Sequence, residues 1–253
     1  MNKLIDIIQQ EEDCFPKILA SYEKRPYGYL FYDPDNKSYY DSNHALLFRD
    51  QIDNLEEVLD DLVAFYKEKD IHPSIYQSLR DPGFFTDNQA VFEKKGFRVW
   101  LEDPAHIMVL NGPNKLGLPG DIQVKRLDEW DKRIENHICL PAQEAYNIGM
   151  FKRLIKEPSA TTLVAYKDHE ALGILSFHVT KTSCRFDYIL MAPKARNKGY
   201  ASQLLSYAID YCQKNKIKNC FQWPAHKQSE YICYKGGFRT LFTTEVARAS
   251  YRA

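Results

Sequence analysis

A run of eleven residues near the middle of the chain restricts its possible folds more than any other feature. Residues 111–121 read Asn-Gly-Pro-Asn-Lys-Leu-Gly-Leu-Pro-Gly-Asp and include three glycines and two prolines. Such a run cannot sustain a helix or a central strand, because proline has no backbone N–H and glycine punctuates regular structure. With 253 residues in all, there is room for two ordinary domains. We therefore expect a linker at 111–121 between a first domain over 1–110 and a second over 122–253.

The first half is predicted to be built around one long amphipathic helix. Apolar residues from Leu55 to Tyr66 recur at the spacing of a single helical face. Asp53 and Glu56 precede this stripe with the spacing of a capping box. The remaining elements expected here are a helix over 3–10, strands over 27–33 and 45–48, a helix over 86–95 and a strand over 97–101.

In the second half, predicted strands alternate with predicted helices. The strands are expected over 122–127, 162–166, 171–179, 185–191, 219–223 and 238–242, with a last strand over 246–251 closing the same sheet. The helices are expected over 130–139, 142–155, 199–214 and 227–235. This alternation is typical of an α/β fold in which helices cover a mixed sheet.

The two halves share one short sequence pattern. Phe92-Glu-Lys-Lys-Gly-Phe97 and Cys233-Tyr-Lys-Gly-Gly-Phe238 both stand where a predicted helix ends and a strand begins. Glycine is the usual helix terminator, so the pattern alone says little. Together with the similar lengths of the two halves, it favours a duplicated domain.

Composition and charge exclude several classes of protein. The chain has 34 Lys and Arg residues against 34 Asp and Glu, and its 17 tyrosines are scattered, which argues against nucleic-acid binding. No run of 18 apolar residues occurs, so we expect no membrane span. The N-terminal segment turns acidic before a signal-peptide core could form. The six cysteines form no CxxC pair, so we expect reduced thiols, a cytoplasmic location and no metal.

The segment from Asp187 to Leu205 has the character of an anion-binding site. A strand is predicted to end near Met191, and a helix opens at Gly199. The first backbone N–H groups of a helix are unpaired and carry partial positive charge, which suits a phosphate. Arg196 and Lys198 add positive charge beside them. The alternative is a basic loop in front of an ordinary helix.

The same segment resembles a known family. Arg196-Asn-Lys-Gly-Tyr-Ala201 is similar to the [Arg/Gln]-x-x-Gly-x-[Gly/Ala] signature of the GNAT (Gcn5-related) N-acetyltransferases. Further along, His226-Lys-Gln-Ser229 and Gly237-Phe238 resemble the family's Asn-x-x-Ser and Gly-Phe segments. The resemblance covers roughly residues 121–253. It implies two GNAT-like domains, each with a mixed, mostly antiparallel sheet flanked by helices, the first one degenerate.

The resemblance further implies acetyl-CoA as the co-substrate, bound in a cleft where two parallel strands splay apart. Backbone groups around the signature would hold the pyrophosphate, and the end of the strand before it would pair with the pantetheine arm. A histidine stands where the family has asparagine. The residues expected to bind the coenzyme are Leu190, Met191, Arg196, Asn197, Lys198, Gly199, Tyr200, Ala201, Ser202, His226 and Ser229.

The expected reaction is direct attack of an amine on the thioester, which requires a base and a proton donor. Asp187 lies four residues before Met191 and is expected on the same face of the strand, where it could point toward the cleft as a candidate base; the alternative is a solvated carboxylate. The family's usual proton donor is a tyrosine at the position that Cys233 holds here. Tyr234 is the favoured donor, with Tyr231 close by and a packing role as the alternative.

The first half has no such signature before its long helix, so the resemblance implies that it carries no coenzyme and shapes the acceptor pocket. The acceptor is expected to be an amine of a small molecule or a peptide. A second hypothesis is a binding protein of the same fold that senses acyl-CoA without turnover. Domains of this family often dimerise, so a homodimer is compatible with the resemblance.

Overall fold

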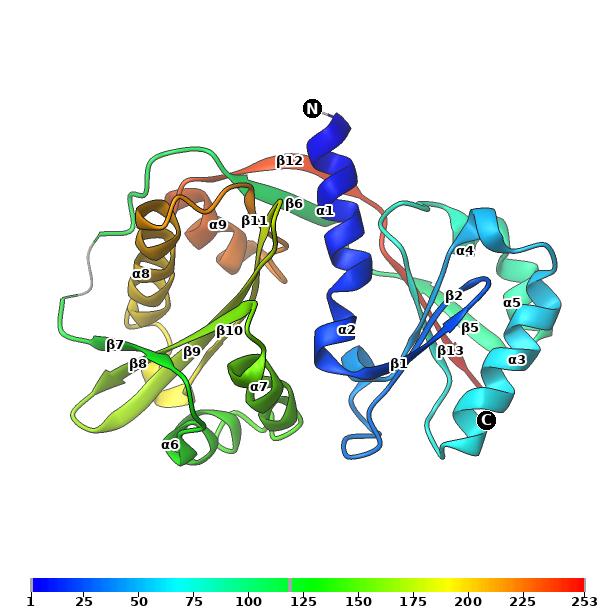
Figure 1. The fold of residues 1–253 in the computed structure, drawn as a ribbon, viewed down its shortest axis with the longest axis horizontal. Coiled ribbons are helices and arrows are strands. Elements are labelled where there is room, and N and C mark those ends of the chain that lie inside the picture. The colour runs from blue at the N-terminus through cyan, green and yellow to red at the C-terminus, as the bar shows by residue number, and fades with distance from the viewer. Residues whose placement is uncertain (1, 118–119, 253) are drawn as a thin grey trace. The chain divides into compact units, whose positions relative to one another are not determined.

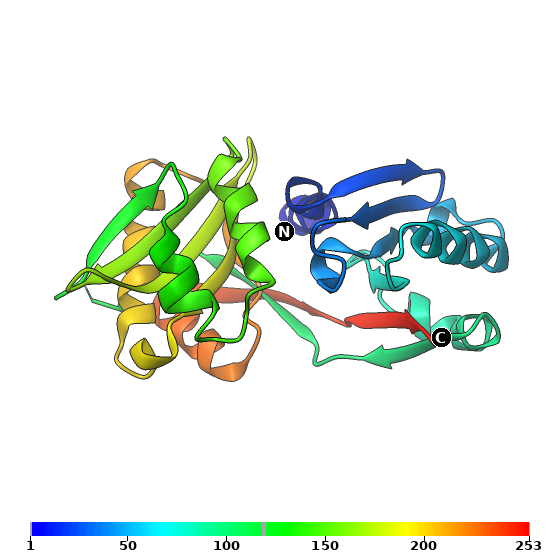
Figure 2. The same cartoon turned by 90° about the horizontal axis from the view of Figure 1, so that it is seen from below.

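The computed structural model describes residues 2–117 and 120–252 and separates into two units, each with its own sheet (Figure 1, Figure 2). The seven-stranded unit contains residues 2–7 and His106–Phe242. The six-stranded unit contains Ile8–Ala105 and residues 243–252. Each unit is an α/β structure with a mixed sheet, as the sequence predicts.

The seven-stranded sheet has the order β12-β6-β11-β10-β9-β8-β7. Its strands are β6 (Ala105–Leu110), β7 (Gln123–Leu127), β8 (Ala160–Lys167), β9 (Glu170–Val179), β10 (Cys184–Met191), β11 (Cys220–Gln222) and β12 (Phe238–Thr244). Its helices are α6 (Lys132–Ile134), which continues as a π-turn over Glu135–Cys139, α7 (Asn147–Lys156), α8 (Tyr200–Lys214) and α9 (Lys227–Lys235). β10 and β11 are parallel, and α8 connects them.

Helices cover both faces of this sheet, with α8 and α9 on one side and α6 and α7 on the other (Figure 1). β8 and β9 are therefore buried along almost their whole length. This explains why apolar residues stand at consecutive positions in both strands, as in residues 163–166 and 171–175, rather than alternating with polar ones. The aromatic rings follow the same division: Phe177 of β9 packs against Tyr211 of α8, and Tyr188 of β10 packs against Phe151 of α7.

The six-stranded sheet has the order β1-β2-β3-β4-β13-β5. Its strands are β1 (Ser21–Arg25), β2 (Gly28–Tyr32), β3 (Ala45–Leu47), β4 (Ser74–Gln77), β5 (Phe97–Leu101) and β13 (Ala247–Tyr251). Its helices are α1 (Asn2–Cys14), α2 (Pro16–Leu19), α3 (Leu55–Glu68), α4 (Phe84–Asp87) and α5 (Gln89–Lys94). β3 and β4 are parallel, and α3 connects them as α8 connects β10 and β11.

Each sheet contains one strand from the other half of the sequence. β6, from the first half, lies between β11 and β12, and β13, from the end of the chain, lies between β4 and β5. The inserted strand occupies the same place in both sheets. Such a reciprocal exchange is expected if the two units are copies of one fold. β6 follows β5 in the chain and β13 follows β12, so β6 and β13 are then equivalent strands, each paired in the sheet of the other unit.

This exchange differs from the domain ranges expected from the sequence. The strand over 105–110 belongs to the sheet of the second half, although it precedes the predicted linker at 111–121. The prediction that residues 246–251 close the second sheet is wrong, because β13 pairs with β4 and β5. Hydrophobic patterning identifies a strand but not its partners, and here the partners lie far along the chain. The sequence analysis also missed β1, β4 and β6.

The helix α3 confirms the predicted amphipathic stripe but corrects its cap. The N-cap residue is Asn54, whose side chain accepts hydrogen bonds from the backbone N–H groups of Glu56 and Glu57 at 3.1 and 3.5 Å. Asp53 therefore stands one residue too early to serve as the predicted capping residue. The predicted helix over 86–95 is also interrupted, at Asn88, and forms α4 and α5.

The pattern shared by the two halves has the same structure in both units. Gly96 and Gly237 end their helices in the left-handed region, with φ of 83° and 96°. Phe97 and Phe238 then begin β5 and β12 with side chains that are almost fully buried. The equivalence supports the interpretation of a duplicated domain. None of the helices in the described ranges has the length and apolar character needed to cross a membrane.

Candidate functional site

The two parallel strands of the seven-stranded sheet separate soon after they meet. The ladder between β10 and β11 contains two residue pairs, Cys184 with Cys220 and Arg185 with Phe221. β10 then continues to Met191 along β9 only. Among the described residues, no strand pairs with the β11-facing edge of β10 beyond Arg185. An extended ligand can therefore add to this edge by backbone hydrogen bonds.

A β-bulge interrupts β10 at the point of separation. Phe186 pairs with Phe177 and Ile189 with Leu175, so three residues of β10 are matched by two of β9. The extra residue breaks the two-residue alternation of side chains. The prediction that Asp187 shares a face with Met191 assumed an unbroken strand and is wrong for that reason. Leu190 and Met191, the residues expected beside the pantetheine arm, are both buried at the end of this strand.

The helix α8 begins at an unprotected end. Its N-cap is Gly199, in the left-handed region at φ 79°, and no side chain of the described residues caps the helix. The N–H groups of Tyr200, Ala201 and Ser202 thus precede the first intrahelical bond, which runs from Gln203 N to Gly199 O at 3.1 Å.

The helix start is also open to a ligand. Apart from Gly199 and its two neighbours in the chain, no described residue has an atom within 4 Å of the position that a Cβ on Gly199 would take. Asn197, just before, also has a positive φ of 60°. The first turn of α8 contains no acidic residue. These features together give the geometry of an anion site, with free donors, open space and no opposing charge.

Three basic residues lie between β10 and α8, and they differ in their surroundings. Lys194 pairs with Glu170. Arg196 donates from Nε to the carbonyl of Met191 at 3.3 Å, which ties the loop to the end of β10. Lys198 is exposed, directly before Gly199. Arg196 therefore fixes the position of the loop, whereas Lys198 remains available to a phosphate.

His226 and Ser229, predicted to contact the coenzyme, form the start of α9. The Nδ1 of His226 accepts from the backbone N–H of Ser229 at 3.1 Å, and the hydroxyl of Ser229 accepts from the backbone N–H of His226 at 3.2 Å. This is a reciprocal capping box. It occupies Nδ1 of the imidazole, so Nε2 is the ring nitrogen through which His226 can touch a ligand.

The residues near the end of α9 have contrasting environments. Cys233 is buried, and burial raises the pKa of its thiol to about 12. Tyr234 is 55% exposed, and the guanidinium of Arg239 lies 4.1 Å from the centre of its ring. Tyr231 is 58% exposed. The position of the family's usual tyrosine is therefore filled by a buried core thiol, and the nearest phenols, those of Tyr231 and Tyr234, are more than half exposed.

Asp187 lies in the bulge, where its carboxylate pairs with the guanidinium of Arg185. Both side chains are mostly buried, at 13% and 15% exposure. The ion pair places the carboxylate of Asp187 at the point where β10 and β11 separate. A carboxylate in such a pair can attract an ammonium group, and it can accept a proton only at the expense of the pair.

The sequence analysis missed a second carboxylate beside the bulge. Glu144, in the loop before α7, accepts through Oε2 from the hydroxyl of Tyr188 and from Nδ2 of Asn147, both at 2.7 Å. Asn147 is fully buried. No sequence pattern predicts a contact between residues 144 and 188. The sequence shows only that Glu144 is an acidic residue in the loop before a predicted helix.

The six-stranded unit lacks an equivalent anion site in its described residues. Its counterpart of α8 is α3, where Asn54 already occupies two backbone donors. The first turn of α3 carries Glu56 and Glu57, which would repel a phosphate. The contrast between the two helix starts agrees with the prediction that the first half is a degenerate copy.

Comparison with known proteins supports the assignment of the second half. Residues 125–231 match the sequence model of the acetyltransferase (GNAT) family. The chain is similar in structure to a GCN5-related N-acetyltransferase from Kribbella flavida, with a TM-score of 0.66 and 10% identity over 97% of this chain and 95% of that one. No curated protein matches the sequence.

Two further solved structures share the arrangement. A functionally unknown conserved protein from Staphylococcus epidermidis ATCC 12228 gives a TM-score of 0.64 at 11% identity, over 93% of this chain and 96% of that chain. A tandem GNAT protein from the clavulanic acid biosynthesis pathway gives 0.55 at 10% identity, over 82% and 75%. Identities this low establish a shared fold. Residues 125–231 of the seven-stranded unit therefore match the GNAT acetyltransferase family, and the chain shares the fold of a tandem GNAT protein.

Proposed function

We propose that the protein is an acetyl-CoA-dependent N-acetyltransferase. The family of its seven-stranded unit performs acyl transfer in general. The observation that carries the proposal is the uncapped, glycine-opened start of α8 beside the open edge of β10. Free N–H groups there suit a pyrophosphate, and the strand edge suits the amides of a pantetheine arm.

The acceptor is an amine. Its nitrogen attacks the thioester carbonyl carbon, a C–N bond forms, the C–S bond breaks and the coenzyme leaves as a thiolate that takes up a proton. Two carboxylates lie at the bulge, those of Asp187 and Glu144. Together they favour an acceptor that arrives as an ammonium ion, and Asp187 is the proposed acceptor of its proton. Tyr234 is the proposed donor to the leaving thiolate.

A non-catalytic acyl-CoA sensor is the second candidate. The observation that favours it is Cys233, a buried thiol at the position where the family usually has its tyrosine. In a sensor the coenzyme binds and no acetyl group is transferred.

The two candidates differ in turnover. Release of free CoA thiol is followed spectroscopically while the full chain is incubated with acetyl-CoA and a panel of small-molecule and peptide amines. Amine-dependent thiol release that is lost in Gly199→Glu supports the enzyme. Saturable acetyl-CoA binding with no thiol release above the amine-free rate across the panel supports the sensor.

A further inference from the structure

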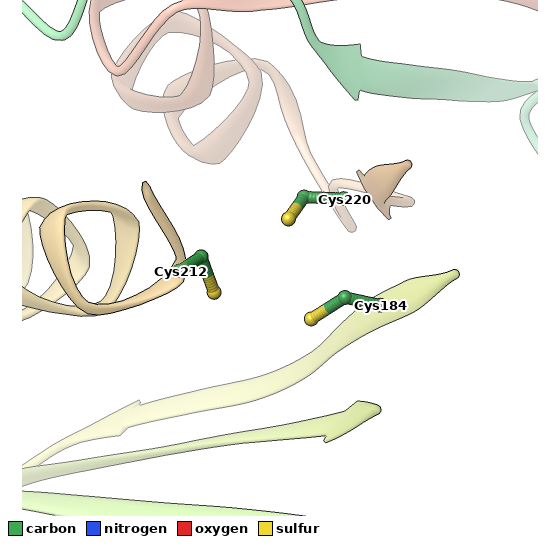
Figure 3. Close-up of side chains that lie close together, drawn as sticks. All are labelled: Cys184, Cys212 and Cys220. Atoms are coloured by element: carbon green, nitrogen blue, oxygen red, sulfur yellow. The ribbon is translucent and has the colours of Figure 1, made fainter. Parts of the chain in front are cut away.

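Three cysteines that are distant in the sequence meet in the core of the seven-stranded unit. Cys184 lies at the start of β10, Cys220 at the start of β11 and Cys212 near the end of α8. Their Sγ atoms all lie within 4.8 Å of one another. The three side chains point toward a common centre between the helix and the two strands (Figure 3). We call this group the thiol triad.

The triad is enclosed by protein. Cys184 and Cys212 are fully buried, and Cys220 is 3% exposed. The three sulfur atoms therefore lie close together in a space that is closed to bulk solvent. A buried thiolate is a ready ligand for a soft metal ion.

The spacing of the sulfur atoms suits one metal ion. Metal–thiolate bonds are about 2.3 Å long. Three sulfurs around one ion in a plane therefore lie roughly 4.0 Å apart. The triad holds its sulfurs within 4.8 Å, so shifts of less than an ångström bring all three into bonding distance. Side-chain rotation about χ1 supplies movements of this size.

We propose that the thiol triad is a binding site for one Cu(I) ion. Thiolates are soft ligands, which select Cu(I), zinc or iron–sulfur clusters over magnesium and calcium. Structural zinc sites almost always have four ligands. In the described part of the chain, the group offers three sulfurs and no histidine or carboxylate. Three sulfurs in a buried site complete the coordination of Cu(I) but leave Zn(II) one ligand short.

The position of the triad gives the bound ion a structural consequence. Cys184 and Cys220 form one of the two residue pairs that join β10 to β11. Cys212 belongs to α8, whose first turn is the candidate anion site. The bound ion would therefore cross-link β10, β11 and α8 at the point where β10 separates from β11. Each thiol that becomes a thiolate ligand releases one proton on binding.

The test is an anaerobic titration of the reduced full-length protein with Cu(I), supplied as its bicinchoninate complex. All proteins carry Cys14→Ala, which removes the partly exposed thiol of the six-stranded unit. We expect one Cu(I) per chain, a thiolate-to-copper absorption band in the ultraviolet and a higher melting temperature. Cys212→Ala and Cys220→Ala are expected to lose at least tenfold in Cu(I) affinity. Cys139→Ala, which removes a buried thiol outside the triad, is the matched control and is expected to bind normally.

Several results overturn the proposal. If the Cys14→Ala protein shows no saturable Cu(I) binding, the site does not exist. This result does not depend on whether the Cys212→Ala and Cys220→Ala variants fold. Equal affinity in Cys212→Ala with a native circular dichroism spectrum places the copper elsewhere. Retention of Zn(II) against an equimolar amount of Cu(I) shows that the triad is a zinc site and that the assignment of the metal is wrong.

Discussion

The substitution Gly199→Glu tests the anion site at the start of α8. Gly199 has φ 79°, and nothing in the described chain lies within 4 Å of a Cβ at this position. Because a Cβ at this position meets no neighbour, the cost to stability comes from the left-handed backbone, about 1–2 kcal/mol for a residue other than glycine. A carboxylate at a helix N-terminus stabilises the fold by about 0.3–1 kcal/mol. We therefore expect a loss of stability of about 1 kcal/mol.

The effect on coenzyme binding is expected to be much larger. The carboxylate enters the open space in front of the free N–H groups of Tyr200, Ala201 and Ser202. Two negative charges 4 Å apart repel by about 1 kcal/mol in bulk water and about 4 kcal/mol near a protein surface. This range corresponds to a loss of affinity of roughly 5- to 1000-fold. Displacement of the pyrophosphate by the side chain itself adds to the loss.

Isothermal titration calorimetry with acetyl-CoA measures the affinity, and circular dichroism verifies the fold. Gly199→Gln separates the bulk of the side chain from its charge. Gly117→Glu is the matched control, since Gly117 has the same φ of 79° and the same open surroundings outside the site. Undiminished affinity of Gly199→Glu with a native spectrum refutes the anion-site reasoning.

Three further predictions concern catalysis, packing and pH. Tyr234→Phe is expected to lower turnover about 100-fold with little change in the KM for acetyl-CoA. Steady-state kinetics measure both constants, with Tyr231→Phe as the control variant, and an unaffected kcat contradicts the proton-donor role of Tyr234. Gly237→Ala is expected to lower the free energy of unfolding, measured in urea, more than Gly117→Ala does. A Cβ on Gly237 would lie 2.4 Å from a backbone oxygen, whereas a Cβ on Gly117 has no neighbour within 4 Å. Equal losses of stability in the two variants contradict this reasoning. Burial raises the pKa of Asp13 to about 6, so its folded form holds the proton more tightly than the unfolded chain and its contribution to stability falls as the pH rises from about 4 to about 6. Unfolding measured at pH 4 and pH 7 is expected to show wild type losing roughly 2 kcal/mol relative to Asp13→Asn over this range, and parallel pH profiles contradict the shift.

Local features of the fold were readable from the sequence. The apolar stripe of α3, the glycine that opens α8 and the Gly-Phe junctions before β5 and β12 each depend on residues within one or two helical turns. Local propensity and patterning act over the same distance. These elements therefore appear in the structure close to their predicted bounds.

Features that depend on distant residues were not readable. The strands β6 and β13 are ordinary apolar segments, and nothing in their sequences reveals that each completes the sheet of the other half. The bulge that turns Asp187 away from the expected face is an insertion in a strand pairing, which is defined only once β9 is in place. The contact of Glu144 with Tyr188 and the thiol triad are likewise products of tertiary structure.

The exchange of strands also changes how the units can be studied. A fragment that begins after residue 120 lacks β6, the strand between β11 and β12 in the seven-stranded sheet. Removing a central strand exposes the hydrogen-bonding edges of both neighbours. Experiments on coenzyme binding therefore need the full chain, and point substitutions must replace truncation in locating the site.

The central claim is that one coenzyme site exists per chain and lies at the start of α8. Native mass spectrometry of the full-length protein titrated with acetyl-CoA counts the bound molecules directly. We predict that the wild-type protein saturates at one acetyl-CoA per chain and that Gly199→Glu needs at least about fivefold more acetyl-CoA to reach the same occupancy. Two molecules per chain, or the same titration curve for Gly199→Glu and wild type, would contradict the account.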